Sequence, residues 1–113
     1  MTANRHLYLG KISSIKFGFG GYQDLQLGVS VTLSGDGWGV SSFRGHWGTM
    51  RRHDCKWSED ERLLELGRAC IWIRDMLKEA KKKTIDELVN IPVEAEFSDS
   101  GALIDWRVLK EVL

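Results

Sequence analysis

Strict alternation of apolar and polar residues over 25–33 constrains the fold of this chain more than any other sequence feature. The apolar positions are Leu25, Leu27, Val29, Val31 and Leu33, and the residues between them are Gln, Gly, Ser and Thr. Successive side chains of a strand point to opposite faces. A period of two therefore predicts a strand with one buried face.

Two further strands are predicted on either side of this one. Residues 6–17 are rich in Leu, Ile, Tyr and Phe, which suit a pleated surface. We expect the glycine-rich stretch 18–21 to end that strand. Residues 34–37 read Ser-Gly-Asp-Gly, which favours a turn because glycine accepts a positive φ. Residues 38–47 return as a strand, so the three segments predict an antiparallel meander.

A long helix is predicted over residues 58–82. Ser58 supplies a capping hydroxyl, and Glu61 completes a capping box. Acidic residues at 59–61 and lysines at 81–83 suit the two ends of the helix dipole. One apolar stripe at helical spacing is expected to face the sheet: Leu63, Leu66, Cys70, Ile73 and Leu77.

Trp72 falls away from that stripe, beside Arg68, Asp75 and Glu79. The core of a single subunit does not explain an indole on the polar side of a helix. We therefore predict that Trp72 lies at a subunit interface or under a second covered face of the helix.

The rest of the chain predicts a short helix and two more strands. Thr84 and Glu87 form another capping box, and Pro92 ends this helix. Residues 93–97 and 103–109 alternate like strands around a Ser-Asp-Ser-Gly turn. The order βββ-α-α-ββ predicts one α+β domain over residues 1–113. In it, a long and a short helix pack on one face of a five-stranded antiparallel sheet.

Composition argues against several classes of protein. Sixteen Lys and Arg balance sixteen Asp and Glu, whereas proteins that bind duplex DNA usually carry a basic excess. No apolar run reaches the roughly 18–20 residues that span a bilayer, and we see no signal peptide. Two cysteines do not make a disulfide framework. We expect a cytoplasmic protein with neither a membrane nor duplex DNA as its partner.

The segment 18–24 is the most distinctive binding candidate. Its glycines leave backbone N–H groups accessible, its aromatic rings can stack on a flat base, and its polar ends can form hydrogen bonds. The spacing is not that of the dinucleotide fingerprint, and no helix follows. The alternative is a hairpin connection with its aromatic residues tucked into the core. The predicted ligand-binding residues are Phe19, Gly20, Gly21, Tyr22, Gln23 and Asp24.

Cations beside aromatic residues mark a second candidate, the loop over residues 47–57. A guanidinium binds phosphate as a fork, and an indole stacks on a base. The alternative is a solvated basic loop that leads into the helix. The ligand contacts predicted from this loop are Trp47, Arg51 and Lys56.

Arg44 and Arg107 complete the predicted binding set. Both fall within predicted strands, where a rigid anion site can be built. The alternative is that each lies on a solvated sheet face.

The sequence contains binding chemistry but no catalytic constellation. His53 and Cys55 have the spacing of two metal ligands, but a structural zinc site needs four. Cys55 also lacks the orienting third group that an activated nucleophile needs. We expect a protein that is not an enzyme and holds neither metal nor cofactor.

Four separated motifs resemble those of a family of small bacteriophage and prophage proteins. They are KISSIKFGFGGYQD at 11–24, GWGV at 37–40, CKWSED at 55–60 and WRVLKEVL at 106–113. Together they are similar to the Thoeris anti-defence sponge proteins of the first type. The resemblance covers nearly the whole chain.

This resemblance implies a phage product in the host bacterial cytoplasm that binds cyclic ADP-ribose isomers and does not hydrolyse them. Bacterial TIR-domain proteins make these isomers as alarm signals, so sequestration deprives the immune effector of its activator. The resemblance also implies homodimers that can assemble into hexamers, with the signal bound where two subunits meet. Cyclic oligonucleotides can occupy separate sites in related sponges.

Two other functions are compatible with the sequence. One is a phage inhibitor that binds a host defence protein, such as a CRISPR effector, through exposed tryptophans. The other is a small module for single-stranded nucleic acid, with aromatic residues and arginines on a sheet. A stoichiometric host partner would favour the first, and salt-dependent binding of oligonucleotides would favour the second.

Overall fold

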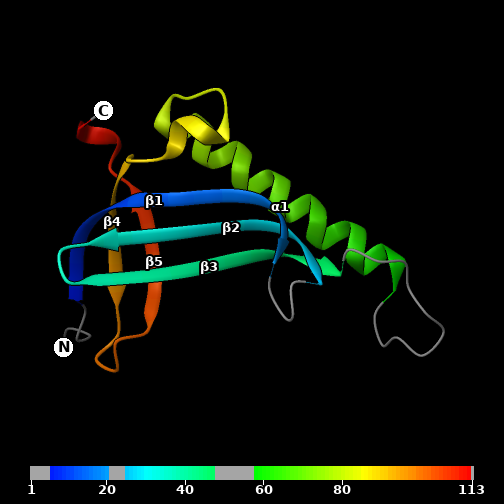
Figure 1. Ribbon diagram of the computed structural model, residues 1–113, viewed down its shortest axis with the longest axis horizontal. Coiled ribbons are helices and arrows are strands. Elements are labelled where there is room, and N and C mark those ends of the chain that lie inside the picture. The colour runs from blue at the N-terminus through cyan, green and yellow to red at the C-terminus, as the bar shows by residue number, and fades with distance from the viewer. Residues whose placement is uncertain (1–5, 21–24, 48–57, 113) are drawn as a thin grey trace.

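The computed structural model describes residues 6–20, 25–47 and 58–112 (Figure 1). The described elements in chain order are β1 (His6–Gly20), β2 (Gln26–Gly35), β3 (Trp38–Trp47), α1 (Glu59–Ala80), η2 (Ile85–Leu88), β4 (Pro92–Phe97), β5 (Leu103–Val108) and η3 (Lys110–Val112). The predicted α+β class, with five antiparallel strands and one long helix, is confirmed.

The strands form one sheet in the order β3-β2-β1-β4-β5, so β1 is its central strand. Residues 10–20 of β1 pair with β2, whereas residues 6–11 pair with β4. Figure 1 shows β4 and β5 crossing β2 and β3 steeply, so the sheet is curled. Helix α1 packs on β2 and β3 and also reaches β5.

An extra residue in β1 accommodates this curl. The pairing with β2 shifts between Ile12 and Ser14, which leaves Ser13 unmatched. The Ser13 hydroxyl donates to the carbonyl oxygen of Thr32 at 3.1 Å. Because such a bulge breaks the period of two, Ile12 and Ile15 both lie in the core, at 0% and 8% exposure.

The alternation in β2 sets the core face as predicted. Val29, Val31 and Leu33 are at most 1% exposed and pack in one cluster with residues of α1 and β4. Leu25 does not belong to the pattern, because it precedes β2 and is largely exposed.

The prediction that the glycine-rich stretch ends the first strand is wrong, because β1 continues through Gly20. Gly18, Gly28 and Gly45 face one another across the three strands β1, β2 and β3. A Cβ on Gly28 would collide with the carbonyl oxygen of Arg44, whereas one on Gly18 would meet nothing within 4 Å. Glycine at position 28 therefore permits a close approach of β2 and β3.

Helix α1 begins where the capping box predicts. The Glu61 N–H donates to Ser58 Oγ at 3.1 Å, and Lys81 ends the helix with a left-handed φ of 59°.

The predicted apolar stripe of α1 is wrong in part. The buried residues of the helix are Ala69, Met76 and Ala80, whereas Leu63 is 59% exposed and Cys70 is exposed. The predicted stripe was chosen by the helical spacing of the large apolar side chains. The sheet instead packs on the side where the two alanines permit close approach.

The predicted second short helix is a single 3-10 turn, η2. The Glu87 N–H donates to the carbonyl oxygen of Thr84, three residues back, and Leu88 is buried beneath the turn. The capping box is present: the backbone N–H groups of Lys83 and Thr84 donate to Glu87 Oε1. Both bonds lower the pKa of Glu87, and the one from Lys83 has the larger effect.

Substitution of two facing glycines tests the close approach of β2 and β3. We expect Gly28→Ala to lower the free energy of unfolding by about 1–3 kcal/mol, because the added methyl group must displace backbone. Urea denaturation measures this difference. Gly18→Ala is the matched control and should leave the midpoint essentially unchanged. Equal midpoints for the two variants would contradict the proposed role of Gly28.

Candidate functional site

Three adjoining hollows surround the side chain of Arg44, between β3, β5 and α1. Their volumes are about 370, 340 and 180 Å³, and Arg44 lines all three. Trp72 of α1 and Asp105 and Trp106 of β5 line the first and the last. We define the Arg44 groove by these four residues.

The register of β3 places Arg44 under the helix. Arg44 stands opposite Val29 in the register, so its side chain projects from the same face of the sheet, the one that α1 covers. Because β3 is an edge strand, the guanidinium also reaches solvent. Curling of the sheet brings β5, the opposite edge strand, to the same hollow.

A cation and two indoles contact one another in the groove. Cζ of Arg44 lies 4.4 Å from the ring centroid of Trp72, a cation–π contact. The rings of Trp72 and Trp106 meet edge to face, with centroids 6.4 Å apart and an interplanar angle of 65°. Within the described ranges, no carboxylate forms an ion pair with Arg44.

Trp72 lies under a covered face of α1, the second of its two predicted placements, whereas its place at a subunit interface stays a prediction. Its indole is partly buried inside the subunit, packed against the core and held between Arg44 and Trp106. The physical reason is that the buried side of α1 is rotated away from the predicted stripe, toward Ala69 and Met76. The tertiary structure of one subunit is therefore sufficient to explain this tryptophan.

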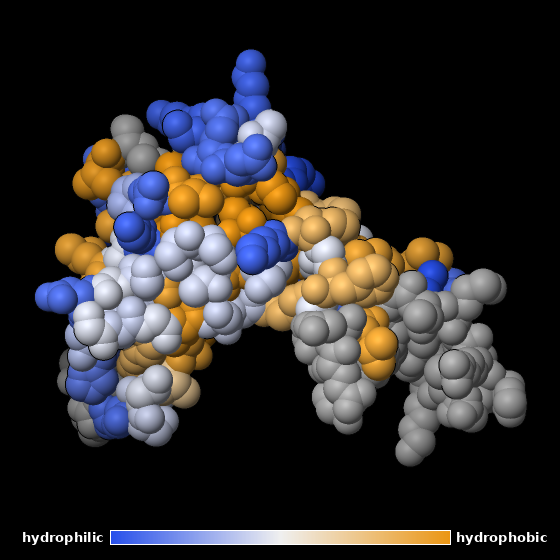
Figure 2. Space-filling view, in the orientation of Figure 1, coloured by the Kyte–Doolittle hydropathy of each residue, from blue (hydrophilic) through white to orange (hydrophobic). Residues whose placement is uncertain are grey.

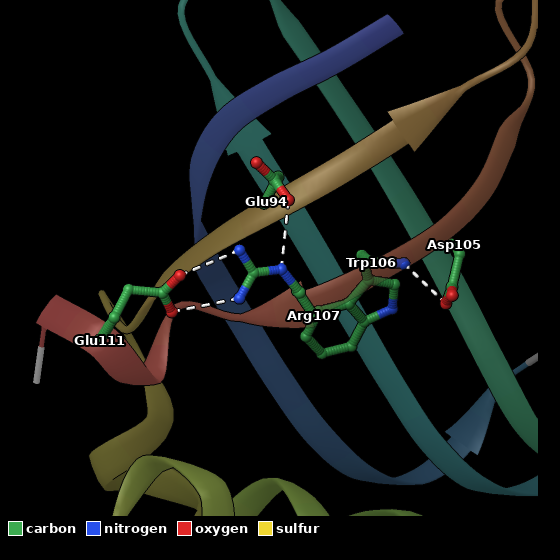
Figure 3. Close-up of polar contacts among 5 residues, drawn as sticks. All are labelled: Glu94, Asp105, Trp106, Arg107 and Glu111. Carbon is green, nitrogen blue, oxygen red and sulfur yellow. Dashed lines mark hydrogen bonds and ion pairs between the residues drawn. The ribbon is translucent and has the colours of Figure 1, made fainter. Parts of the chain in front are cut away.

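Arg107 is engaged by two carboxylates (Figure 3). Its Nε donates to Glu94 Oε1 at 3.1 Å, and its Nη1 and Nη2 donate to the two carboxylate oxygens of Glu111 at 3.1 and 3.0 Å. These bonds raise the pKa of Arg107, and those to Glu111 have a larger effect than the one to Glu94. Any anion that used this fork would have to displace a carboxylate.

Carboxylates restrict what the Arg44 groove can bind. Asp75, Glu79 and Asp105 line its smallest hollow together with Arg44 and Arg107. Asp105 accepts the backbone N–H of Trp106 at 2.8 Å. A ligand with two phosphates would therefore need cations beyond Arg44.

The structure places three other predicted residues at one end of the sheet: Phe19, Gly20 and Trp47. Phe19 is 66% exposed near the end of β1. Gly20 and Trp47 both pair with Gln26, one from each neighbouring strand. Six predicted ligand contacts lie outside the described residues: Gly21, Tyr22, Gln23, Asp24, Arg51 and Lys56.

Asp105 and Trp106 are groove residues that the sequence reasoning did not select. The alternation in β5 indicates only that Trp106 points toward the core face, and no local signal links it to α1. A larger hollow lies elsewhere: it has about 610 Å³ at the β2–β3 turn and is lined by none of the predicted site residues.

The described residues contain no group of three or more His, Cys, Asp or Glu side chains placed to hold a metal ion. His53 and Cys55, the metal-like pair in the sequence, lie outside that part of the chain. Helices long and apolar enough to cross a membrane are absent from the same residues.

Comparison of the chain with protein-family models, curated proteins and solved structures yields no match. The candidate site is therefore interpreted from its own geometry.

The pairing of Arg107 with Glu111 predicts a pH dependence. Its guanidinium lowers the pKa of Glu111, so the pairing stabilises the fold at neutral pH and this stabilisation is lost as the pH falls through that lowered pKa. NMR titration of the Glu111 carboxyl carbon measures the shift. In Arg107→Gln we expect the pKa of Glu111 to rise toward its ordinary value, because the guanidinium that lowers it most is gone. An unchanged titration in this variant would exclude the pairing.

Proposed function

We propose that this protein binds a small phosphorylated cyclic nucleotide of the cyclic ADP-ribose class and holds it without making or breaking a bond. The observation that carries the proposal is the Arg44 guanidinium, which lies over the Trp72 indole and faces a hollow of about 370 Å³. Ligand pockets for small molecules are typically about 300–1,000 Å³. The motif resemblance to the Thoeris anti-defence sponges supports the choice of ligand class and a role in sequestering a host immune signal.

The chemistry of the groove suits this ligand in two respects. A guanidinium can donate two parallel hydrogen bonds to a phosphate. The rings of Trp72 and Trp106 offer aromatic surface to a purine, and such stacking contributes about 1–3 kcal/mol per base.

Nanomolar affinity for the ligand favours a site with more cations than one groove supplies. A sponge with nanomolar affinity needs about −12 kcal/mol, and each hydrogen bond to a charged group contributes roughly 1.5–3 kcal/mol. Two hydrogen bonds from one arginine and stacking on two indoles give about 5–12 kcal/mol, which reaches this total only at its upper limit. We therefore include a second subunit and the loop residues Arg51 and Lys56 in the proposed site.

Self-association is proposed through the side of α1 that faces away from the sheet. Leu63, Leu64 and Ile71 are 59%, 55% and 48% exposed. Figure 2 shows apolar residues reaching the surface along α1. Pairing of this side with its copy would bury apolar surface that a single subunit leaves in water. Such homodimers could assemble further into hexamers.

Calorimetry and native mass spectrometry with 2′- and 3′-linked cyclic ADP-ribose test the proposed function. We expect submicromolar binding and release of intact ligand on heating. We expect Arg44→Gln to weaken binding about tenfold to a hundredfold, because one charge-assisted hydrogen bond is lost.

Lys16→Gln is the control, because Lys16 is an exposed cation of β1 that lines none of the three hollows. It should bind like the unmodified chain. Affinity weaker than micromolar, or a degraded ligand, would refute the proposal. Stoichiometric capture of a host protein instead would favour a direct inhibitor, and salt-dependent binding of oligonucleotides would favour a nucleic-acid module.

Gel filtration with multi-angle light scattering tests the proposed interface. We expect a mass of at least twice the 12.9 kDa of one chain, and a single-chain mass for Leu64→Glu. Val89→Glu is the control, because Val89 is 40% exposed outside α1. A single-chain mass for the unmodified protein at high concentration would rule out self-association.

A further inference from the structure

A hollow larger than those around Arg44 carries chemistry that differs from that of the Arg44 groove. It has a volume of about 610 Å³ and lies between the start of β1, the β2–β3 turn and the β4–β5 turn. We call it the Trp38 cavity; the lining residues that matter here are His6, Tyr8, Asp36, Trp38, Phe97 and Asp99. The two sites share no lining residue.

Three aromatic rings form its apolar wall. The centroid of the Phe97 ring lies 5.3 Å from that of Trp38 at 74°, and 5.7 Å from that of Tyr8 at 68°. Phe97 is 7% exposed and Tyr8 is 48% exposed, so the wall runs from the buried floor to the rim. Such edge-to-face contacts hold the rings in place.

The backbone is adapted to the position of the Trp38 indole. Gly10 and Gly35 stand opposite each other in β1 and β2, and a Cβ on either would collide with the indole. Each of the two strands therefore carries a glycine, which has no side chain, at the point where this ring lies. The aromatic wall is a built feature of the sheet, not a gap left by poor packing.

The polar lining is acidic. Asp36 and Asp99 both line the cavity, and no lysine or arginine of the described ranges does. The Asp99 carboxylate is bonded to His6 Nε2, with Oδ1 and Nε2 2.9 Å apart. A phosphate would be repelled by this lining, whereas a cation would be attracted to it.

We propose that the Trp38 cavity binds a small organic cation, an alkylated ammonium group on a short apolar chain. Aromatic faces attract such a group through their quadrupoles, and carboxylates add charge complementarity. A neutral ligand of the same shape would gain only the apolar contact. This proposal does not depend on nucleotide binding at the Arg44 groove.

Assigned indole N–H resonances provide the test, with choline as the probe and 3,3-dimethylbutan-1-ol as its neutral isostere. We expect choline to bind with a Kd on the order of 1 mM or tighter, and to shift the Trp38 indole but not the Trp72 indole. The neutral isostere should bind about tenfold more weakly. Equal affinities, equal shifts at both indoles, or no binding of choline tighter than about 10 mM would overturn the proposal.

Variants separate the aromatic from the acidic contribution. Tyr8→Leu and Asp36→Asn should each weaken choline binding several-fold, whereas Tyr8→Phe keeps the ring and should not. Unchanged amide spectra outside the cavity would establish that each variant is folded. If Tyr8→Leu and Asp36→Asn both fold and bind choline like the unmodified chain, the cavity is not the site. Cyclic ADP-ribose binding by Tyr8→Leu should stay unchanged, which distinguishes failure of this proposal from failure of the nucleotide proposal.

Discussion

The rest of the structure depends on one constraint: β1 must pair with two strands that run in different directions. Its first residues pair with β4 and its last residues pair with β2. A flat strand cannot satisfy both, so β1 bends where Ser13 is inserted. The backbone of Ile12 remains bonded at this bend: its N–H donates to the Ile91 carbonyl oxygen at 3.0 Å, and its carbonyl oxygen accepts from the Asn90 N–H at 2.7 Å.

The bend decides which side chains meet. A flat sheet would hold its two edge strands, β3 and β5, on opposite sides. Curling brings Arg44 of β3 and Trp106 of β5 to the same indole of α1. The Arg44 groove therefore exists only because the sheet is curled. The same curl brings Trp38, near the other end of β3 from Arg44, against Phe97 of β4.

The two sites divide charge in a chain whose formal net charge is zero. Arg44 forms no ion pair within the described residues, although three carboxylates line the smallest hollow of its groove. The Trp38 cavity holds two carboxylates and no lysine or arginine from those residues. The net charge of the whole chain argues only against a general surface for binding nucleic acid. Local separation of charge would let each proposed site attract a ligand of opposite charge.

The sequence by itself determined the elements: the period of two in β2, the capping box at Ser58, the glycine turn at Gly37 and the α+β class all follow from local physics. It also placed Arg44 on a strand. Only the tertiary structure decided which residues meet, because the bulge at Ser13, the rotation of α1 toward its alanines and the occupation of Arg107 by Glu111 depend on contacts between distant segments. Trp72 illustrates the difference: helical spacing placed it on a polar side, and the curl of the sheet partly buried it.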